Sequence, residues 1–324
     1  MTVMKLVVNC SDTFNLGVHK LNAWLDDSDI IDAKSLTPMD IMNASSIWCS
    51  AIFSWDLPAL KKVSQDAAFY GKPCTVGGPA VTANAQWIKD HCYGATVNEG
   101  LHDCDTVQGQ WPMVWTSRGC IRDCPWCIVP KIEGHQMVEY SELQYAPLIL
   151  DNNFLACSEQ HQQKVLELWS GKKVDFNQGL DARLYSPAFR KEVKSHKVKS
   201  TVWRFAYDSG GMGKHVERAI DDLRSAGIAY NNIRIYLLFN HTEAIDEAVA
   251  RAKEIIEWGA SPWPMAYKPL DWMSKDYYIS PQWHRSAIID FRRFFSRGQL
   301  WRSTTWEDYN NTDIAYVNEL MTCL

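Results

Sequence analysis

No apolar run in the 324-residue chain approaches the roughly 20 residues that a membrane-spanning helix needs. The chain also lacks a large excess of one charge, because its net charge is -5 at pH 7, which gives no global attraction to nucleic acid. Its first residues, MTVMKLVVNCSDTF, turn polar after a short apolar stretch, which favours a buried strand over a signal peptide. We therefore expect a cytoplasmic protein without membrane contact.

The composition is that of a folded protein, with 46% apolar and 22% charged residues and no internal repeat. The length suits one large domain or two ordinary ones. In a reducing compartment the ten cysteines favour metal or catalytic roles over disulfides. Seven of them are scattered, and we expect them to be small buried hydrophobic residues: Cys10, Cys49, Cys74, Cys92, Cys104, Cys157 and Cys323.

Short apolar runs alternate with helical patterns over the first part of the chain. Strands are predicted at 5–10, 45–53 and 73–82, with helices at 16–25 and 57–71. This alternation predicts a Rossmann- or flavodoxin-like parallel sheet over residues 1–108, ending in a turn-rich segment.

Longer units follow from residue 109. Strands are predicted at 112–117, 146–153, 173–179, 200–209, 232–240 and 262–270, with amphipathic helices at 216–227 and 245–259. Six strands with intervening helices predict a partial (β/α)6 parallel barrel over 109–270, two units short of a complete barrel. Residues 271–324 mix arginines with aromatic residues and are expected to form a helical C-terminal extension.

Three cysteines lie within eight positions in SRGCIRDCPWCIVP. Cys120, Cys124 and Cys127 follow a predicted strand, with the spacing C-x3-C-x2-C. A structural zinc site needs four ligands, and Cys104, His135 and Cys157 do not stand at zinc-site spacing. An iron–sulfur cluster accepts thiolates from one tight loop, and three thiolates leave one iron open to another ligand. The spacing favours such a cluster, with zinc binding and plain packing as the alternatives.

The chain here resembles the radical S-adenosylmethionine (SAM) superfamily, in which C-x3-C-x2-C follows the first barrel strand and an aromatic residue precedes the third cysteine. Trp126 is that aromatic residue, and the resemblance spans about residues 110 to 270, including 204–228 and 235–259. It implies a [4Fe-4S] cluster whose fourth iron is chelated by SAM. Electron transfer then yields a 5′-deoxyadenosyl radical that abstracts hydrogen from a substrate. It also implies a one-electron donor, such as flavodoxin or ferredoxin, as partner.

Cofactor contacts are expected where polar residues follow the barrel strands, because ligands meet the carboxyl ends of parallel strands. The resemblance suggests that Asp151 or Asn153 accepts from the methionyl ammonium group and that Arg204 pairs with its carboxylate. It places Gln178 or Asp208 at the ribose and Trp126 near the adenine, and it leaves Asn240 and Tyr267 as further contacts. The family usually has a glutamate motif after the second strand, where this chain has DNNF at 151–154.

The alternative reading gives these polar residues structural roles, as helix caps or partners of loop backbone. By the same argument Asp181 and Arg183 are candidates for a structural ion pair. Lys131, Glu133 and His135 are expected in a solvated loop.

The N-terminal region resembles the cobalamin-binding domain of cobalamin-dependent members of the superfamily. The likeness lies in residues 45–56 and in 72–82, which contain a Gly-Gly-Pro turn. The axial-ligand motif D-x-H-x-x-G is absent, and His19 is expected to be a packing or surface histidine. Either this domain binds cobalamin, or it shapes a substrate entrance or receives a partner.

The tail offers a possible nucleic-acid surface, since arginines interleaved with aromatic residues suit phosphate contacts and base stacking. The arginines are Arg285, Arg292, Arg293, Arg297 and Arg302, among Phe294, Phe295, Trp301 and Trp306. Amphipathic helices that close a barrel have the same pattern, so packing is the alternative.

Together these patterns predict a radical SAM enzyme whose substrate is not identified. The leading reaction is cobalamin-dependent methyl transfer to an unactivated carbon. A cobalamin-independent modification or isomerisation of a nucleobase or small metabolite is the first alternative. A non-catalytic iron–sulfur binding module is the second.

Overall fold

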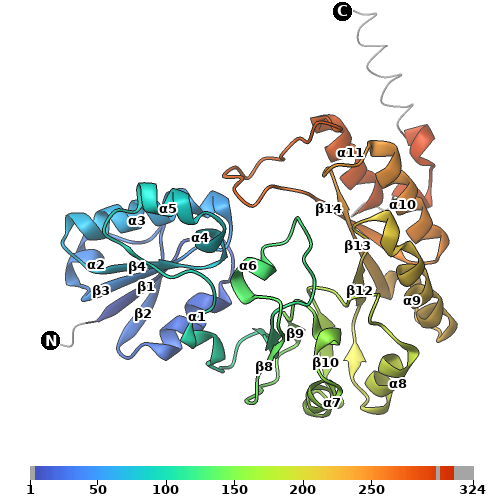
Figure 1. Cartoon of the computed structure of the whole chain (residues 1–324), viewed down its shortest axis with the longest axis horizontal. Coiled ribbons are helices and arrows are strands. Elements are labelled where there is room, and N and C mark those ends of the chain that lie inside the picture. Colours follow the sequence, from blue (N-terminus) through green and yellow to red (C-terminus); the bar gives the residue numbers. More distant parts are fainter. Residues whose placement is uncertain (1–3, 297–299, 310–324) are drawn as a thin grey trace, which may run out of the picture. The chain divides into compact units, whose positions relative to one another are not determined.

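The computed structural model describes residues 4–296 and 300–309 and has mixed α/β architecture with parallel sheets (Figure 1). The chain divides into two compact units. The first comprises Met1–Gln178, Glu192–Ser200 and Pro269–Asp276; the second comprises Gly179–Lys191, Thr201–Lys268 and Tyr277–Leu324. The α/β class is therefore confirmed, whereas the predicted domain boundaries near residues 108 and 270 stay predictions.

The first unit begins with a five-stranded parallel sheet in the order β2-β1-β3-β4-β5. The strands are β1 (Lys5–Asn9), β2 (Ser28–Asp32), β3 (Ser46–Ser50), β4 (Cys74–Gly77) and β5 (Thr96–Val97). Val7, Val8, Ile47 and Val76 are buried at its centre. Sequence reasoning missed β2, because its sequence SDIID forms a polar, half-exposed edge strand.

Helices connect these strands, and their starts follow from local capping. The Asn15 side chain accepts from the Val18 amide at the start of α1, and Thr37 and Asp40 form a capping box at the start of α2. The helices are α1 (Leu16–Trp24), α2 (Pro38–Asn43), α3 (Leu57–Phe69), α4 (Pro79–Ala83) and α5 (Ala85–His91), with 3-10 turns η1 (Ser54–Asp56) and η2 (Asp103–Thr106).

A second sheet of the first unit has the order β11-β10-β9-β6, all parallel. Its strands are β6 (Met113–Val114), β9 (Leu148–Ile149), β10 (Lys173–Phe176) and β11 (Lys199–Ser200). An antiparallel pair, β7 (Ser117–Arg118) and β8 (Val138–Glu139), brackets the cysteine segment. The helices here are α6 (Val129–Glu133), η3 (Phe154–Ala156), α7 (Glu159–Leu168) and α8 (Pro187–Ser195), whose residues are shared between the units.

The second unit has a three-stranded parallel sheet, β12 (Trp203–Ala206), β13 (Ile233–Phe239) and β14 (Ser261–Ala266). Its helices are α9 (Gly213–Ser225), α10 (Ile245–Glu257) and α11 (Arg285–Phe295), with η4 (Gly210–Met212), η5 (Tyr230–Asn232) and η6 (Leu300–Arg302). The apolar stripe predicted for α9 is buried as expected: Val216, Ala219, Ile220 and Leu223.

All six strands predicted after residue 109 are present, and each is parallel to its neighbours. Hydrogen bonding groups them as β6-β9-β10 and β12-β13-β14, so their closure into one partial barrel stays a prediction.

The predicted helical extension differs from expectation at its start, since residues 271–284 form no helix and α11 begins only at Arg285. Phe291, Phe294, Phe295 and Trp306 are buried, which favours packing over base stacking for these rings. Arg297, Cys323 and the rest of 310–324 lie outside the described residues. In the part of the chain that is described, no helix has both the length and the apolar character to cross a membrane.

Candidate functional site

The three clustered cysteines lie on one loop of the first unit between β7 and α6, and each is half-buried. Gly119 opens this loop with φ +96°, and a Cβ placed there would lie 2.0 Å from the Gln136 carbonyl oxygen. Only glycine therefore lets the strand pair β7–β8 close at this point. Inside the loop the Cys127 amide donates to the Cys124 carbonyl at 3.0 Å.

Two N–H groups reach the cysteine sulfurs. The Val129 amide nitrogen lies 3.5 Å from Cys127 Sγ. The Asn153 carboxamide nitrogen lies 3.5 Å from Cys120 Sγ, and Asn153 is only 2% exposed. Trp126 stands inside the loop and is half-buried. Cys120 Sγ and Cys127 Sγ are thus each within hydrogen-bonding distance of an N–H group.

Glu133 closes the base of the loop, contrary to the expectation of a solvated segment. Its carboxylate accepts from the Gly119 amide at 2.6 Å and from the Asn152 carboxamide at 2.8 Å. It also pairs with Arg118 Nη2 at 2.9 Å, and the Glu133 side chain is 5% exposed. Arg118 stacks on Trp115, with its guanidinium carbon 4.0 Å from the ring centre. His135 and Lys131 are exposed, as expected.

Asp151 holds the strand that leads into the loop. Its buried carboxylate accepts from the Thr116 amide at 2.6 Å, from the Thr116 hydroxyl and from the Ser117 hydroxyl at 2.8 Å. Burial raises the pKa of Asp151 to about 6, and these hydrogen bonds oppose the rise. The hydrogen bonds assign Asp151 a structural role, while its predicted contact with an ammonium group stays a prediction.

Asp151 also forms a compact, buried group with Cys157 and His161, whose ligand-type atoms lie within 4.8 Å of one another. His161 Nε2 lies 3.1 Å from the Thr116 hydroxyl. Burial raises the pKa of the Cys157 thiol to about 12 and lowers the pKa of His161. Because donors from Thr116 and Ser117 already occupy the carboxylate, this group acts as a hydrogen-bond network.

The segment Asp151–Asn153 therefore contacts the cysteine loop and the residues on both sides of it. Asp151 holds Thr116 and Ser117 before it, Asn152 holds Glu133 after it, and Asn153 reaches Cys120. Sequence reasoning predicted Asp151 and Asn153 here but missed Asn152, Thr116, Ser117 and Glu133. Three consecutive polar residues directly after a buried strand were the available signal.

Four predicted contact residues belong to the second unit. Arg204 is 8% exposed and donates to the Tyr236 hydroxyl at 3.1 Å. Asn240 is fully buried, donates to the Tyr278 carbonyl at 2.7 Å and accepts from the Ser280 amide at 3.1 Å. Asn240 is thus a loop-holding residue, which the alternative reading anticipated. Tyr267 is half-buried and packs edge-on against His241.

Asp208 follows β12 in an electrostatically unusual position. Burial raises its pKa to about 6, and the positive charge of Arg251 opposes that shift. Arg251 is itself buried, donates to the Tyr207 and Leu238 carbonyls, and pairs with Glu243 at 3.0 Å. This cation therefore ties the carboxyl ends of β12 and β13 together. The predicted ion pair of Asp181 with Arg183 is present at 2.7 Å.

Within the first unit, both sheets contribute to one cavity of about 450 Å³. The first sheet contributes Ser50, Gly77 and Asn98 at or after the ends of β3, β4 and β5, and the second contributes Trp115, Leu150, Asn177 and Gln178 after β6, β9 and β10. Its walls are mostly apolar, with carboxamides among them, and Arg118 and Ile132 bring it to the flanks of the cysteine loop. Ligands bind at such carboxyl edges in parallel folds.

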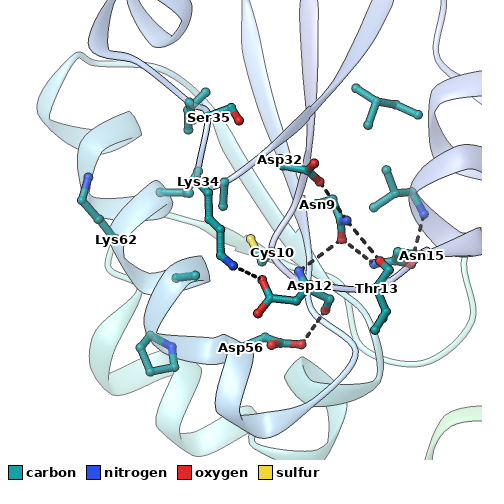
Figure 2. A pocket seen from close by; sticks show the side chains of 18 of the residues that line it. Asn9, Cys10, Asp12, Thr13, Asn15, Asp32, Lys34, Ser35, Asp56 and Lys62 are labelled. Carbon is teal, nitrogen blue, oxygen red and sulfur yellow. Dashed lines mark hydrogen bonds and ion pairs between the residues drawn. The ribbon is translucent and has the colours of Figure 1, made fainter.

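A larger cavity of about 1030 Å³ lies at the carboxyl ends of β1 and β2 (Figure 2). Several of its polar side chains are paired with one another. In Figure 2, Asn9 donates to Asp32 at 3.0 Å and Asp12 pairs with Lys34 at 2.7 Å. Asp12 also pairs with Lys275 at 2.6 Å. These lysines hold the pKa of Asp12 at about 2. The two cavities share Thr13, Phe14 and Asn15.

Outside the loop, the scattered cysteines of the described residues are buried, as predicted: Cys10, Cys49, Cys74, Cys92, Cys104 and Cys157. His19, expected to be a packing or surface histidine, is half-buried and stacks on the exposed Phe14 with ring centres 4.4 Å apart.

The chain was also compared with known proteins. No protein-family model matches it, and no curated protein matches it.

Proposed function

We propose that the protein is a radical SAM enzyme with a [4Fe-4S] cluster on Cys120, Cys124 and Cys127. The observation that carries the proposal is the cysteine loop itself, where three half-buried thiols share one short segment and two of them receive N–H donors. When bound, the cluster supplies the electron that cleaves SAM into methionine and a 5′-deoxyadenosyl radical. Three protein ligands suit this chemistry because they leave one iron open.

The chain's own residues hold the loop in place. Glu133 and Arg118 close its base, while Asp151 fixes the strand that enters it. These contacts are buried, so they restrict the loop that carries the sulfurs, and the contacts around metal ligands affect the chemistry of the metal group. The roles of Arg204 at the SAM carboxylate and of Gln178 or Asp208 at the ribose stay predictions.

The first sheet favours cobalamin-dependent methyl transfer as the specific reaction. Its strand order is the flavodoxin-like one, in which ligands bind at the carboxyl edge. The cavity of about 450 Å³ beside that edge has mostly apolar walls with carboxamides among them, and it shares Thr13, Phe14 and Asn15 with the larger cavity. These features suit a large, flat, amide-bearing cofactor such as a corrinoid. If the protein does not retain hydroxocobalamin after reconstitution, cobalamin-dependent methyl transfer is excluded. A cobalamin-independent radical modification is then favoured.

The cluster is tested by anaerobic reconstitution of the full chain with iron and sulfide. We expect about four irons per protein and brown absorbance in the wild type, as the proposed [4Fe-4S] assignment requires. The triple variant Cys120→Ala, Cys124→Ala, Cys127→Ala should hold almost none. As a matched control, Cys92→Ala removes a buried cysteine outside the loop and should leave the iron content unchanged. A colourless protein with stoichiometric zinc would contradict the proposal.

A further inference from the structure

The carboxamide of Asn153 is the one side chain of the Asp151–Asn153 segment that reaches a cysteine sulfur directly. Its nitrogen lies 3.5 Å from Cys120 Sγ, within the range of an N–H···S hydrogen bond. The residue stands at the start of η3 and is 2% exposed, so water does not compete for this contact. The contact is therefore buried and directional.

The geometry on both sides of Asn153 restrains it. Two residues before Asn153, the Asp151 carboxylate accepts hydrogen bonds from Thr116 and Ser117. The residue directly before Asn153, Asn152, donates to Glu133. On the other side the Ala156 amide donates to the Asn153 carbonyl at 3.0 Å. The backbone that carries the Asn153 carboxamide is thus restrained by contacts that do not depend on the sulfur.

Such a donor changes the energetics of a bound cluster. One-electron reduction, by a low-potential donor such as dithionite, makes the cluster and its thiolates more negative by one charge. A hydrogen bond to a cysteine sulfur then stabilises the reduced form more than the oxidised form, which raises the reduction potential. In a buried site with a low effective dielectric, this difference is larger than in water.

We propose that Asn153 is a positioning residue that raises the reduction potential of the cluster through its hydrogen bond to Cys120. This inference rests on the proposed function, since it requires the cluster. It gives Asn153 a role different from the methionyl-ammonium contact expected from the sequence.

The test is a potentiometric titration of the reconstituted full chain, followed by electron paramagnetic resonance of the reduced cluster. Asn153→Leu keeps the approximate size and removes the donor, whereas Asn153→Asp keeps the shape and places a negative charge beside the sulfur. Asn84→Leu is the matched control, because it removes another buried carboxamide of the first unit, which donates to the Ser54 hydroxyl and to the Ala80 carbonyl. Potentials are measured on the cluster-bearing fraction, so lower loading does not affect the comparison.

We expect the midpoint potential to fall in the order wild type, Asn153→Leu, Asn153→Asp, with Asn84→Leu close to wild type. At a fixed potential, the ratio of reduced to oxidised cluster should drop several-fold in Asn153→Leu; tenfold corresponds to 59 mV for one electron. Wild-type potentials in both Asn153 variants would overturn this inference and leave the proposed function standing. The same holds if Asn84→Leu lowers the potential as much as Asn153→Leu. A wild type with no cluster signal would overturn both.

Discussion

Several ionisable side chains of the first unit are buried and form hydrogen bonds or ion pairs with residues that are distant in sequence. Glu133 binds Gly119, Asn152 and Arg118, although sequence reasoning placed it in a solvated loop. The sequence predicts Asp151 as a site residue because it follows a buried strand. It does not predict the hydrogen bonds that Thr116 and Ser117 donate to the Asp151 carboxylate. Residue type and position after a strand are visible in a sequence, whereas the partner that satisfies a carboxylate depends on tertiary packing.

Lys20 is another buried charge that the sequence did not indicate. It is fully buried in α1, and its ammonium group donates to the Asp105 carbonyl at 2.7 Å and to the Val107 carbonyl. The rings of Trp111 and Trp115 lie 5.8 Å from it. Burial lowers the pKa of Lys20 to about 8, from 10.5. The lysine ties α1 to the segment that leads toward the cysteine loop.

This pKa shift predicts a pH-dependent contribution to stability. Between pH 8 and 10.5 the unfolded chain holds a proton on Lys20 that the folded chain has released, so this residue makes the free energy of unfolding rise with pH. Urea unfolding at several pH values should show a smaller rise in Lys20→Met than in wild type. Lys62→Met, which changes an exposed lysine, should behave as wild type does. Equal pH dependence in wild type and Lys20→Met would contradict the assignment.

At the scale of elements, apolar periodicity predicted the ranges of the long helices and strands well. It gave no signal for the shortest strands. The helices at 213–225 and 245–257 and the strand at 233–239 agree closely with their predicted ranges, because each has a clear apolar repeat. The strands β7 and β8 have two residues each and carry no pattern that sequence reasoning could detect. Yet this pair brackets the cysteine loop, so the element closest to the site was the hardest to predict.

The β7–β8 pair yields a prediction about cluster assembly. Gly119→Ala would place a Cβ 2.0 Å from the Gln136 carbonyl oxygen at a positive φ, which costs about 2 kcal/mol or more and forces the strands apart. We expect the reconstituted variant to hold less than half of the wild-type iron.

Gly171→Ala is the control for that substitution. It also has a positive φ, but nothing lies within 4 Å of its added Cβ, so its iron content should stay near wild type. Full iron loading in Gly119→Ala would mean that closure of β7–β8 is not needed for the site.

At the scale of the molecule, the sequence was sufficient for the α/β class and for the cysteine loop, but not for the closure of the predicted barrel. The strands expected to form it fall into β6-β9-β10 in the first unit and β12-β13-β14 in the second. The candidate residues divide in the same way, with Asp151, Asn153 and Gln178 in the first unit and Arg204, Asp208, Asn240 and Tyr267 in the second. A strand pattern reveals the face that is buried, but not which neighbouring strand completes the sheet.

Of the alternatives considered, a non-catalytic iron–sulfur module would have the same loop and the same cluster. Reductive cleavage of SAM distinguishes the radical SAM enzyme from the binding module. Only an enzyme with an open iron and an ordered SAM site cleaves SAM in this way. Iron content alone is therefore not the most direct test of the central claim.

The decisive measurement is the formation of 5′-deoxyadenosine when reconstituted protein is mixed anaerobically with SAM and dithionite. We expect 5′-deoxyadenosine and methionine in equal amounts from the wild type, and background levels from the Cys120→Ala, Cys124→Ala, Cys127→Ala variant. An intact wild-type cluster that gives no 5′-deoxyadenosine above this background would contradict radical SAM chemistry and favour the binding module.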